Sequence, residues 1–240
     1  MTAQLFVITL ALVLGGLAYA FTAITGYNNA FGFLRLLDVG AEQSIITYVS
    51  AINLLLASLL LFLLYRARRK QAAADARCWQ VLSALFLFLS MDESISIHEN
   101  FANVYPYFVR QGWMPGIMQS HEWIPFGVLF VVAIAVVVIP LLRHVNRRTV
   151  TYMFIAGAIF LAGAIGFEFL GAVMLEYDLV ASKTDALYLG RRIVEEALEM
   201  YGIALFNWII YKEIQRQPAT IDLIETGLLA RGAGRRQATA

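Results

Sequence analysis

The chain has 240 residues, 60% of them hydrophobic and only 15% charged, with a mean hydropathy of +0.69. A soluble domain of this length would need far more polar surface, so the composition excludes that class and predicts an integral membrane protein. The net charge of +1 says little, because charges of opposite sign occupy different parts of the chain. No nucleic-acid-binding motif occurs. The single cysteine, Cys78, excludes an internal disulfide and a cysteine-based zinc site.

Six apolar segments are long enough to cross a bilayer as helices, which takes about 20 residues each. They cover residues 5–27, 44–65, 79–99, 123–142, 150–175 and 192–211. Spanning strands are excluded, because no strand-length alternation of apolar and polar residues is present. The sequence therefore predicts an all-α integral membrane fold, a bundle of six transmembrane helices over residues 1–212. A basic, disordered cytoplasmic tail over residues 213–240 is expected to follow.

Basic residues are concentrated on one side of the predicted bundle. The loops after the second and fourth segments, together with the tail, hold 13 of the 18 Lys and Arg residues, which predicts that this side is cytoplasmic. Both termini are then cytoplasmic, and the predicted location is the bacterial inner (plasma) membrane, crossed several times. The opposite side holds 13 of the 17 acidic residues, so we expect an outward-facing acidic site that attracts cations.

The most informative stretch covers residues 91–99, Met-Asp-Glu-Ser-Ile-Ser-Ile-His-Glu, where several ionisable groups end an otherwise apolar segment. Charge at membrane depth is costly and is rarely kept without a partner or a function. At about 1.5 Å per residue, Asp92, Glu168 and Glu199 each lie about 10 Å below the outer end of their segment. We therefore expect these three carboxylates to face one another inside the bundle.

Carboxylates gathered in this way cannot all ionise without compensation, and a divalent metal ion would supply it. Glu and His side chains on facing helices are the ligands of di-iron and di-manganese bundles, although the strict Glu-x-x-His spacing is absent here. The predicted ligands are Asp92, Glu93, His98, Glu99, Glu168, Glu195, Glu196 and Glu199. Fe, Mn or Zn would suit this mixed set, and an all-oxygen subset would suit Ca²⁺ or Mg²⁺.

A simpler interpretation exists for two of these acids. Arg191 and Arg192 lie four residues before Glu195 and Glu196, so each acid can form an ion pair along its own helix. His121 and Glu122, at the outer start of the fourth segment, are typical of residues at lipid headgroup level.

Two further features concern packing. Ala158, Ala162 and Gly166 recur every four residues in the fifth segment, with Gly163 and Gly171 nearby, which predicts a close approach to a neighbouring helix. The aromatic-rich stretch 100–113 is expected to lie along the outer surface and to cover the site.

Two stretches resemble an uncharacterised family of bacterial multi-span membrane proteins. Residues 88–99 resemble its Asp-Glu-x4-His-Glu helix end, and residues 37–42, Leu-Asp-Val-Gly-Ala-Glu, resemble the stretch that precedes one of its spanning helices. The resemblance covers the second to fourth segments. It implies a multi-span membrane fold and lends no reaction.

Three functions are compatible with these patterns. The first is a metalloenzyme that acts on a lipid or lipid-linked substrate, with a metal-bound water as nucleophile. The second is a cation- or proton-coupled transporter, although the inner helix halves lack matching polar residues and no inverted repeat is evident. The third is a non-catalytic membrane subunit. The expected partners are membrane lipids and a lipid-linked substrate, and no nucleic acid.

Overall fold

The computed structural model describes residues 2–26, 30–41, 43–114 and 122–217. Throughout these ranges the chain forms helices joined by turns, and no strand occurs in them. The long helices are α1 (Thr2–Thr25), α2 (Ile45–Lys70), α3 (Ala76–Ile95), α5 (Ile124–Leu142), α6 (Arg147–Leu161) and α8 (Ala186–Gln215). The π-helical turn η3 (Ala162–Phe167) joins α6 to α7 (Glu168–Glu176), and the short helices are η1 (Ala30–Leu37), η2 (His98–Asn103) and α4 (Tyr105–Arg110).

Five helices in the described ranges are long and apolar enough to cross a membrane. They are Gln4–Thr25, Ile45–Lys70, Ala76–Ile95, Ile124–Leu142 and Arg147–Glu176, the last of which runs through α6, η3 and α7. The predicted all-α fold is confirmed for these ranges, and the apolar helices support the predicted membrane protein. The sixth predicted segment, 192–211, lies inside α8, which is long enough but carries charged residues along its first half.

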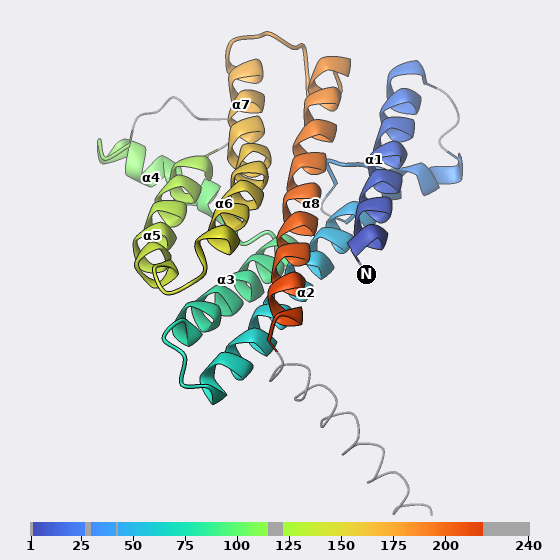
Figure 1. Ribbon diagram of the computed structural model, residues 1–240. Helices are drawn as coiled ribbons and strands as arrows, with labels where there is room; N and C mark the ends of the chain where they lie inside the picture. Colours follow the sequence, from blue (N-terminus) through green and yellow to red (C-terminus); the bar gives the residue numbers. More distant parts are fainter. Residues whose placement is uncertain (1, 27–29, 42, 115–121, 218–240) are drawn as a thin grey trace, which may run out of the picture.

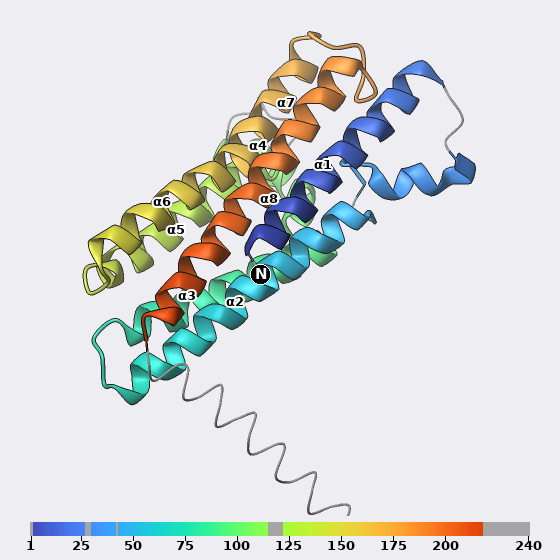
Figure 2. The same ribbon diagram turned by 45° about the vertical axis from the view of Figure 1, so that its right-hand side comes forward.

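The composition of α8 follows from its position. This helix contacts α1, α2, α6, η3 and α7, and Figures 1 and 2 show it running between the α6–α7 helix and α1, across α2. Its buried residues include Ile193, Met200, Ala204 and Ile210. A helix enclosed by other helices can direct charges at them instead of at lipid, so it need not have the uniform apolarity of a lipid-facing span.

The helices α2 and α3 form an antiparallel hairpin, and their joining loop marks one end of the bundle, here named the hairpin end. The other end, where α3 and α7 finish and α8 begins, is named the acidic end. Near the hairpin end Leu61, Leu64, Trp79 and Ile210 are almost fully buried and belong to one apolar core. An aromatic side chain such as Trp79 buries about 150–250 Å², so packing in this core stabilises the hairpin.

The close approach of the α6–α7 helix to α8 uses a different face from that of the four-residue repeat of small residues. Gly163 and Gly171 are buried against α8 as the predicted close approach requires, whereas Ala158, Ala162 and Gly166 of the predicted four-residue repeat are exposed. The contact is made at Gly163, where a Cβ atom would lie 2.7 Å from the backbone oxygen of Glu195. Gly202 of α8 likewise meets the backbone of α6. The buried Met153 and Ala156 set this face, and small residues alone did not identify it.

Several sequence predictions concern the edges of the described ranges. The helix α8 continues to Gln215, three residues beyond the predicted end of the membrane domain, while residues 218–240, His121 and Glu42 lie outside the described residues. The aromatic stretch forms η2 and α4, which pack on the start of α5, with the Phe101 and Phe126 ring centroids 5.0 Å apart.

Candidate functional site

Asp92 closes the turn that ends α3. Its Oδ1 accepts a hydrogen bond from the backbone N–H of His98 at 2.8 Å, and its Oδ2 lies 2.9 Å from His98 Nδ1. Ser96, in the left-handed conformation with φ 50°, reverses the chain between them. Asp92 therefore has a local partner in the turn, and the expectation that it faces Glu168 and Glu199 is replaced by a different arrangement, in which its neighbour Glu93 takes that place.

His98 belongs to this turn and not to the bundle interior. Burial lowers the pKa of its imidazole, but the hydrogen bond and negative charge of Asp92, with the charges of Glu99 and Glu93, outweigh burial and raise the pKa above its ordinary value. The ring also meets the edge of Trp123, with centroids 4.8 Å apart. Glu99 is exposed.

Five glutamates from three elements form the candidate site, here named the glutamate cluster. Its members are Glu93 of α3, Glu168 at the start of α7, and Glu195, Glu196 and Glu199 of α8. Glu196 and Glu199 each interact electrostatically with Glu93 and Glu168, and all five are partly buried. All five belong to the set predicted as metal ligands, and a role for them as ligands stays a prediction.

Arg191 contacts two glutamates of the cluster, one from α7 and one from α8. Its guanidinium lies 2.5 Å from Glu195 Oε2 and 3.7 Å from Glu168 Oε2, so the expected pairing of Arg191 with Glu195 along α8 is confirmed. The side chain is only 6% exposed and also donates a hydrogen bond to the backbone oxygen of Phe167, the last residue of η3. A π turn interrupts regular helix bonding, which leaves backbone groups available for such a bond.

Arg192 points toward the chain segment that precedes α2. It donates a hydrogen bond to the backbone oxygen of Gly40 at 2.8 Å, and its guanidinium occupies the space where a Cβ of residue 40 would lie. The backbone N–H of Gly40 in turn donates to Asp38 Oδ1 at 2.9 Å. The two stretches that resemble the membrane-protein family therefore meet at this site. Stretch 88–99 contributes Glu93 to the glutamate cluster, and stretch 37–42 contributes Gly40, which contacts Arg192 beside it.

The glutamate cluster has more negative than positive groups. Five carboxyl groups adjoin two guanidinium groups, so full ionisation would leave an excess of three negative charges in a partly buried site. Charges that close together in a medium of reduced dielectric repel strongly. The cluster must therefore gain protons or cations to be stable.

Polar residues that sequence reasoning missed extend this site into the bundle. Ser50 and Asn53 of α2 lie beside Glu93 and Glu199, and Asn207 of α8 is fully buried and donates to the backbone oxygen of Asn53 at 3.0 Å. Their spacing on an apolar helix, three residues apart in α2, was the available clue. Ser50 and Asn53 lie in the outer half of α2, and Asn207 adds one polar side chain in the inner half of α8.

The predicted metal ligands do not converge on one point. In the part of the chain that the structure describes, no group of three or more His, Cys, Asp or Glu side chains is arranged to hold a metal ion. Two physical reasons are visible, because Asp92 and His98 bind each other and Arg191 lies against Glu168 and Glu195. The divalent metal stays a prediction.

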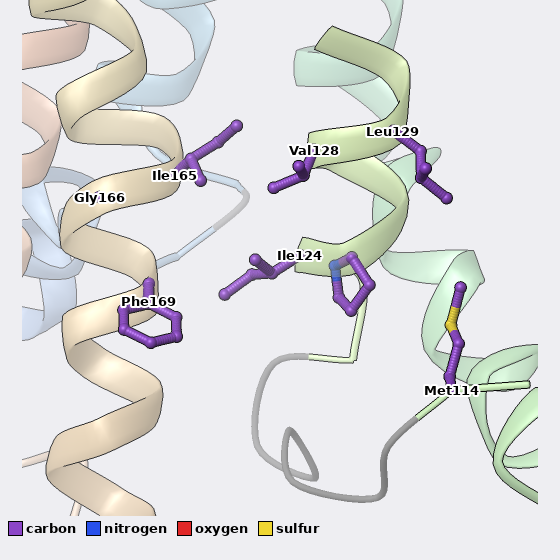
Figure 3. A pocket seen from close by; sticks show the side chains of 8 residues that line it. Met114, Ile124, Val128, Leu129, Ile165, Gly166 and Phe169 are labelled. Carbon is purple, nitrogen blue, oxygen red and sulfur yellow. The ribbon is translucent and has the colours of Figure 1, made fainter. Parts of the chain in front are cut away.

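An apolar groove of about 610 Å³ lies between α5 and the α6–α7 helix. Figure 3 shows Ile165 and Phe169 on one side pointing toward Ile124 and Val128 on the other. The turn η3 thus serves two surfaces, since its Ile165 lines the groove while its Gly163 contacts α8.

A sequence model of one protein family, described as a domain of unknown function (DUF8692), matches residues 4–211. The match spans most of the chain, so the chain belongs to this family. No curated protein and no solved structure matches the chain. The resemblance to a family without an assigned activity is thereby confirmed, and the bacterial origin of that family stays a prediction.

Proposed function

We propose that the glutamate cluster takes up and releases protons, and that this DUF8692 protein is a proton-coupled membrane transporter. One observation carries the proposal: five carboxyl groups from α3, α7 and α8 adjoin only two guanidinium groups inside a bundle of apolar helices. Intramembrane carboxyl groups without enough counter-charge are the usual elements of proton relays. All five glutamates are partly buried, and none is fully enclosed by the protein.

A proton added to the cluster would change the contacts of Arg191. Glu168 and Glu195 are near enough to share a hydrogen bond, and Arg191 contacts both carboxyl groups. Protonation of either acid weakens its attraction for the guanidinium, whereas the bond to the Phe167 oxygen is independent of proton state. The contacts between α7 and α8 therefore depend on proton occupancy, which is the coupling that a transporter requires.

The proposed topology has six crossing helices, with α8 as the sixth, and the acidic end outside. Both termini are then cytoplasmic, because 13 of the 18 Lys and Arg residues lie at the joined ends of α2 and α3, around the turn between α5 and α6, and from Lys212 onward. The single, buried Cys78 simplifies the test. Cysteines placed singly at Asp178 and at Gln71 should react with an impermeant reagent from opposite sides of the membrane, and labelling from one side would contradict this topology.

Infrared difference spectroscopy of the purified protein between two pH values tests the protonation itself. The signal of protonated carboxyl groups should appear as pH falls, and Glu195→Gln should remove part of it. Glu213→Gln is the matched control, since Glu213 lies in the same helix at the hairpin end, where it contacts Thr149 and Arg216. A spectrum unaffected by Glu195→Gln would contradict the proposal.

Transport is tested in proteoliposomes loaded with a pH-sensitive dye. An imposed membrane potential should drive proton flux that requires the protein and that Glu199→Gln reduces, while Glu213→Gln leaves it unchanged. Proton flux equal to that of empty vesicles would contradict the proposed transport function.

The apolar groove favours a second candidate, a protein that acts on a lipid or lipid-linked substrate. The groove is lined by apolar residues of two helices that can cross a membrane, so one acyl chain would fit its chemistry. Gly166→Trp should fill it and reduce the lipid that copurifies, measured by mass spectrometry. Elemental analysis of the same preparation tests the predicted Fe, Mn or Zn, which a stable site would hold near stoichiometrically.

A further inference from the structure

A small cavity lies below the glutamate cluster, between α2, α3, α6 and α8. Its volume is about 10 Å³, room for about one water-sized particle. The polar residues that line it are Ser50, Asn53, Glu93 and Glu199, and the remaining lining, including Phe160, is apolar. The cavity therefore brings four oxygen-bearing side chains from three helices around a space for one particle.

Within the residues that the structure describes, the hydroxyl of Ser50 has no hydrogen-bond partner, although the residue is only 9% exposed. Other serines of the hairpin are satisfied within the protein. Ser58 donates to the Ser83 backbone oxygen at 2.8 Å, and Ser90 donates to that of Ala51 at 2.8 Å. A buried polar group left unpaired is unfavourable and calls for an explanation, of which an absent ligand is one. The position of Ser50 on the cavity wall makes that ligand a particle inside the cavity.

The chemistry of the lining defines the class of particle. A hydroxyl, an amide and two carboxyl groups provide oxygen ligands, which hard cations prefer. The two arginines are engaged elsewhere, Arg191 with Glu195 and Glu168 and Arg192 with Gly40, so neither neutralises this lining directly. The lining is therefore attractive to a positive charge.

The size and ligand number favour a monovalent ion. Ca²⁺ takes six to eight oxygen ligands, and this lining offers six side-chain oxygens only if both carboxyl groups bind through both of their oxygens, whereas Mg²⁺ usually keeps several of its waters, for which the cavity has no room. We propose that this cavity binds one small monovalent cation, Na⁺ or hydronium, held by Ser50, Asn53, Glu93 and Glu199. The inference rests on the proposed function in that the same cluster exchanges the cation.

A second polar side chain lies below the cavity. Asn207, fully buried below the cavity, donates to the Asn53 backbone oxygen, and its side-chain oxygen has no hydrogen-bond partner among the described parts of the chain. A cation released from the cavity toward the hairpin end would meet this second oxygen next. Occupancy of the cavity and proton occupancy of Glu199 are then in competition, because both neutralise the same carboxyl group.

Titration of the purified full-length protein with Na⁺ tests the proposal, with K⁺ and choline as substitutes at constant ionic strength. Thermal unfolding and calorimetry should show stabilisation by Na⁺ above that by K⁺, weaker at low pH. Ser50→Ala should weaken Na⁺ binding about tenfold, which is the loss of about 1.4 kcal/mol. Ser83→Ala is the matched control, a buried serine of the same hairpin that lies away from the cavity. Ser50→Thr keeps the hydroxyl and should retain Na⁺ binding. It shows that the loss in Ser50→Ala comes from the missing hydroxyl and not from misfolding.

Two outcomes of these measurements distinguish Na⁺ from hydronium. Stabilisation by Na⁺ that Ser50→Ala abolishes assigns Na⁺. No effect of Na⁺, together with a change in the pH at which the carboxyl infrared signal appears in Ser50→Ala but not in Ser83→Ala, assigns hydronium. If Ser50→Ala changes neither property, the cavity holds a neutral water or nothing, and the inference is overturned even where the glutamates titrate. Na⁺ binding without any carboxyl titration would instead refute the proposed function alone.

Discussion

The two ends of the helix bundle differ in how completely their polar groups are paired. At the hairpin end Asp75 accepts hydrogen bonds from Arg68 Nε at 2.7 Å and from Trp79 Nε1 at 3.0 Å, so one carboxylate is matched by two donors. At the acidic end five glutamates adjoin two arginines, and neither Ser50 Oγ nor Arg191 Nε has a hydrogen-bond partner in residues 2–26, 30–41, 43–114 and 122–217. The hairpin end is arranged for stability, whereas the acidic end keeps unbalanced groups of the kind that functional sites retain.

Asp75→Ala should have the largest effect on folding. The change leaves the Trp79 indole N–H and the Arg68 guanidinium without their acceptor, and Asp75 is only 5% exposed. We expect the free energy of unfolding to fall by about 3 kcal/mol, the loss typical of breaking a buried ion pair. Unfolding in mixed micelles measures it. The infrared carboxyl signal of the glutamate cluster should stay unchanged, and a change there would show that the two ends are not independent.

Gly163→Ala should have an intermediate effect that reaches both stability and the site. The added Cβ would lie 2.7 Å from the Glu195 backbone oxygen, so the α6–α7 helix must move away from α8. Such overpacking costs about 1–3 kcal/mol. The carboxyl titration should change as well, because Glu195 and Glu199 move relative to Glu168.

Gly166→Ala provides the control for that experiment. Gly166 lies three residues away on the same π turn, and a Cβ there would meet nothing within 4 Å. Equal losses of stability in the two variants would mean that the general intolerance of the turn to alanine, and not contact with α8, explains the effect.

The pH dependence of the Asp92–His98 pair should be the smallest effect. The pKa of His98 is raised, so its stabilising contribution is complete below the unfolded value of about 6.5 and is lost as pH rises through the higher folded value. Because the His98 side chain is 35% exposed, solvent screening keeps the contribution below about 1 kcal/mol. NMR titration of the imidazole in the parent chain and in Asp92→Asn measures the shift, and equal values in both would contradict the pairing.

The sequence predicted the helices well, because long apolar segments have few alternatives in a membrane protein. It also predicted that Glu168 and Glu199 meet, since depth along a helix can be counted in residues. Depth counting could not distinguish Asp92 from Glu93, because adjacent residues differ by only about 1.5 Å along the helix axis. Which of the two faces α8 depends on helix rotation, and the Asp92–His98 turn that decides it becomes visible only in three dimensions. Ser50 and Asn53 were missed because isolated polar residues in an apolar helix are common between packed helices.

The π turn η3 changes the direction in which the residues after it point around the axis of the α6–α7 helix. A π turn is equivalent to one residue inserted into a regular α-helix, so every residue after Phe167 is rotated by about 100° from its regular position. Deletion of one residue from Ala162–Phe167 would restore an unbroken α-helix and turn Glu168 away from Glu195 and Arg191. The meeting of these three charges therefore depends on one supernumerary residue in the backbone, and not only on the identities of the side chains.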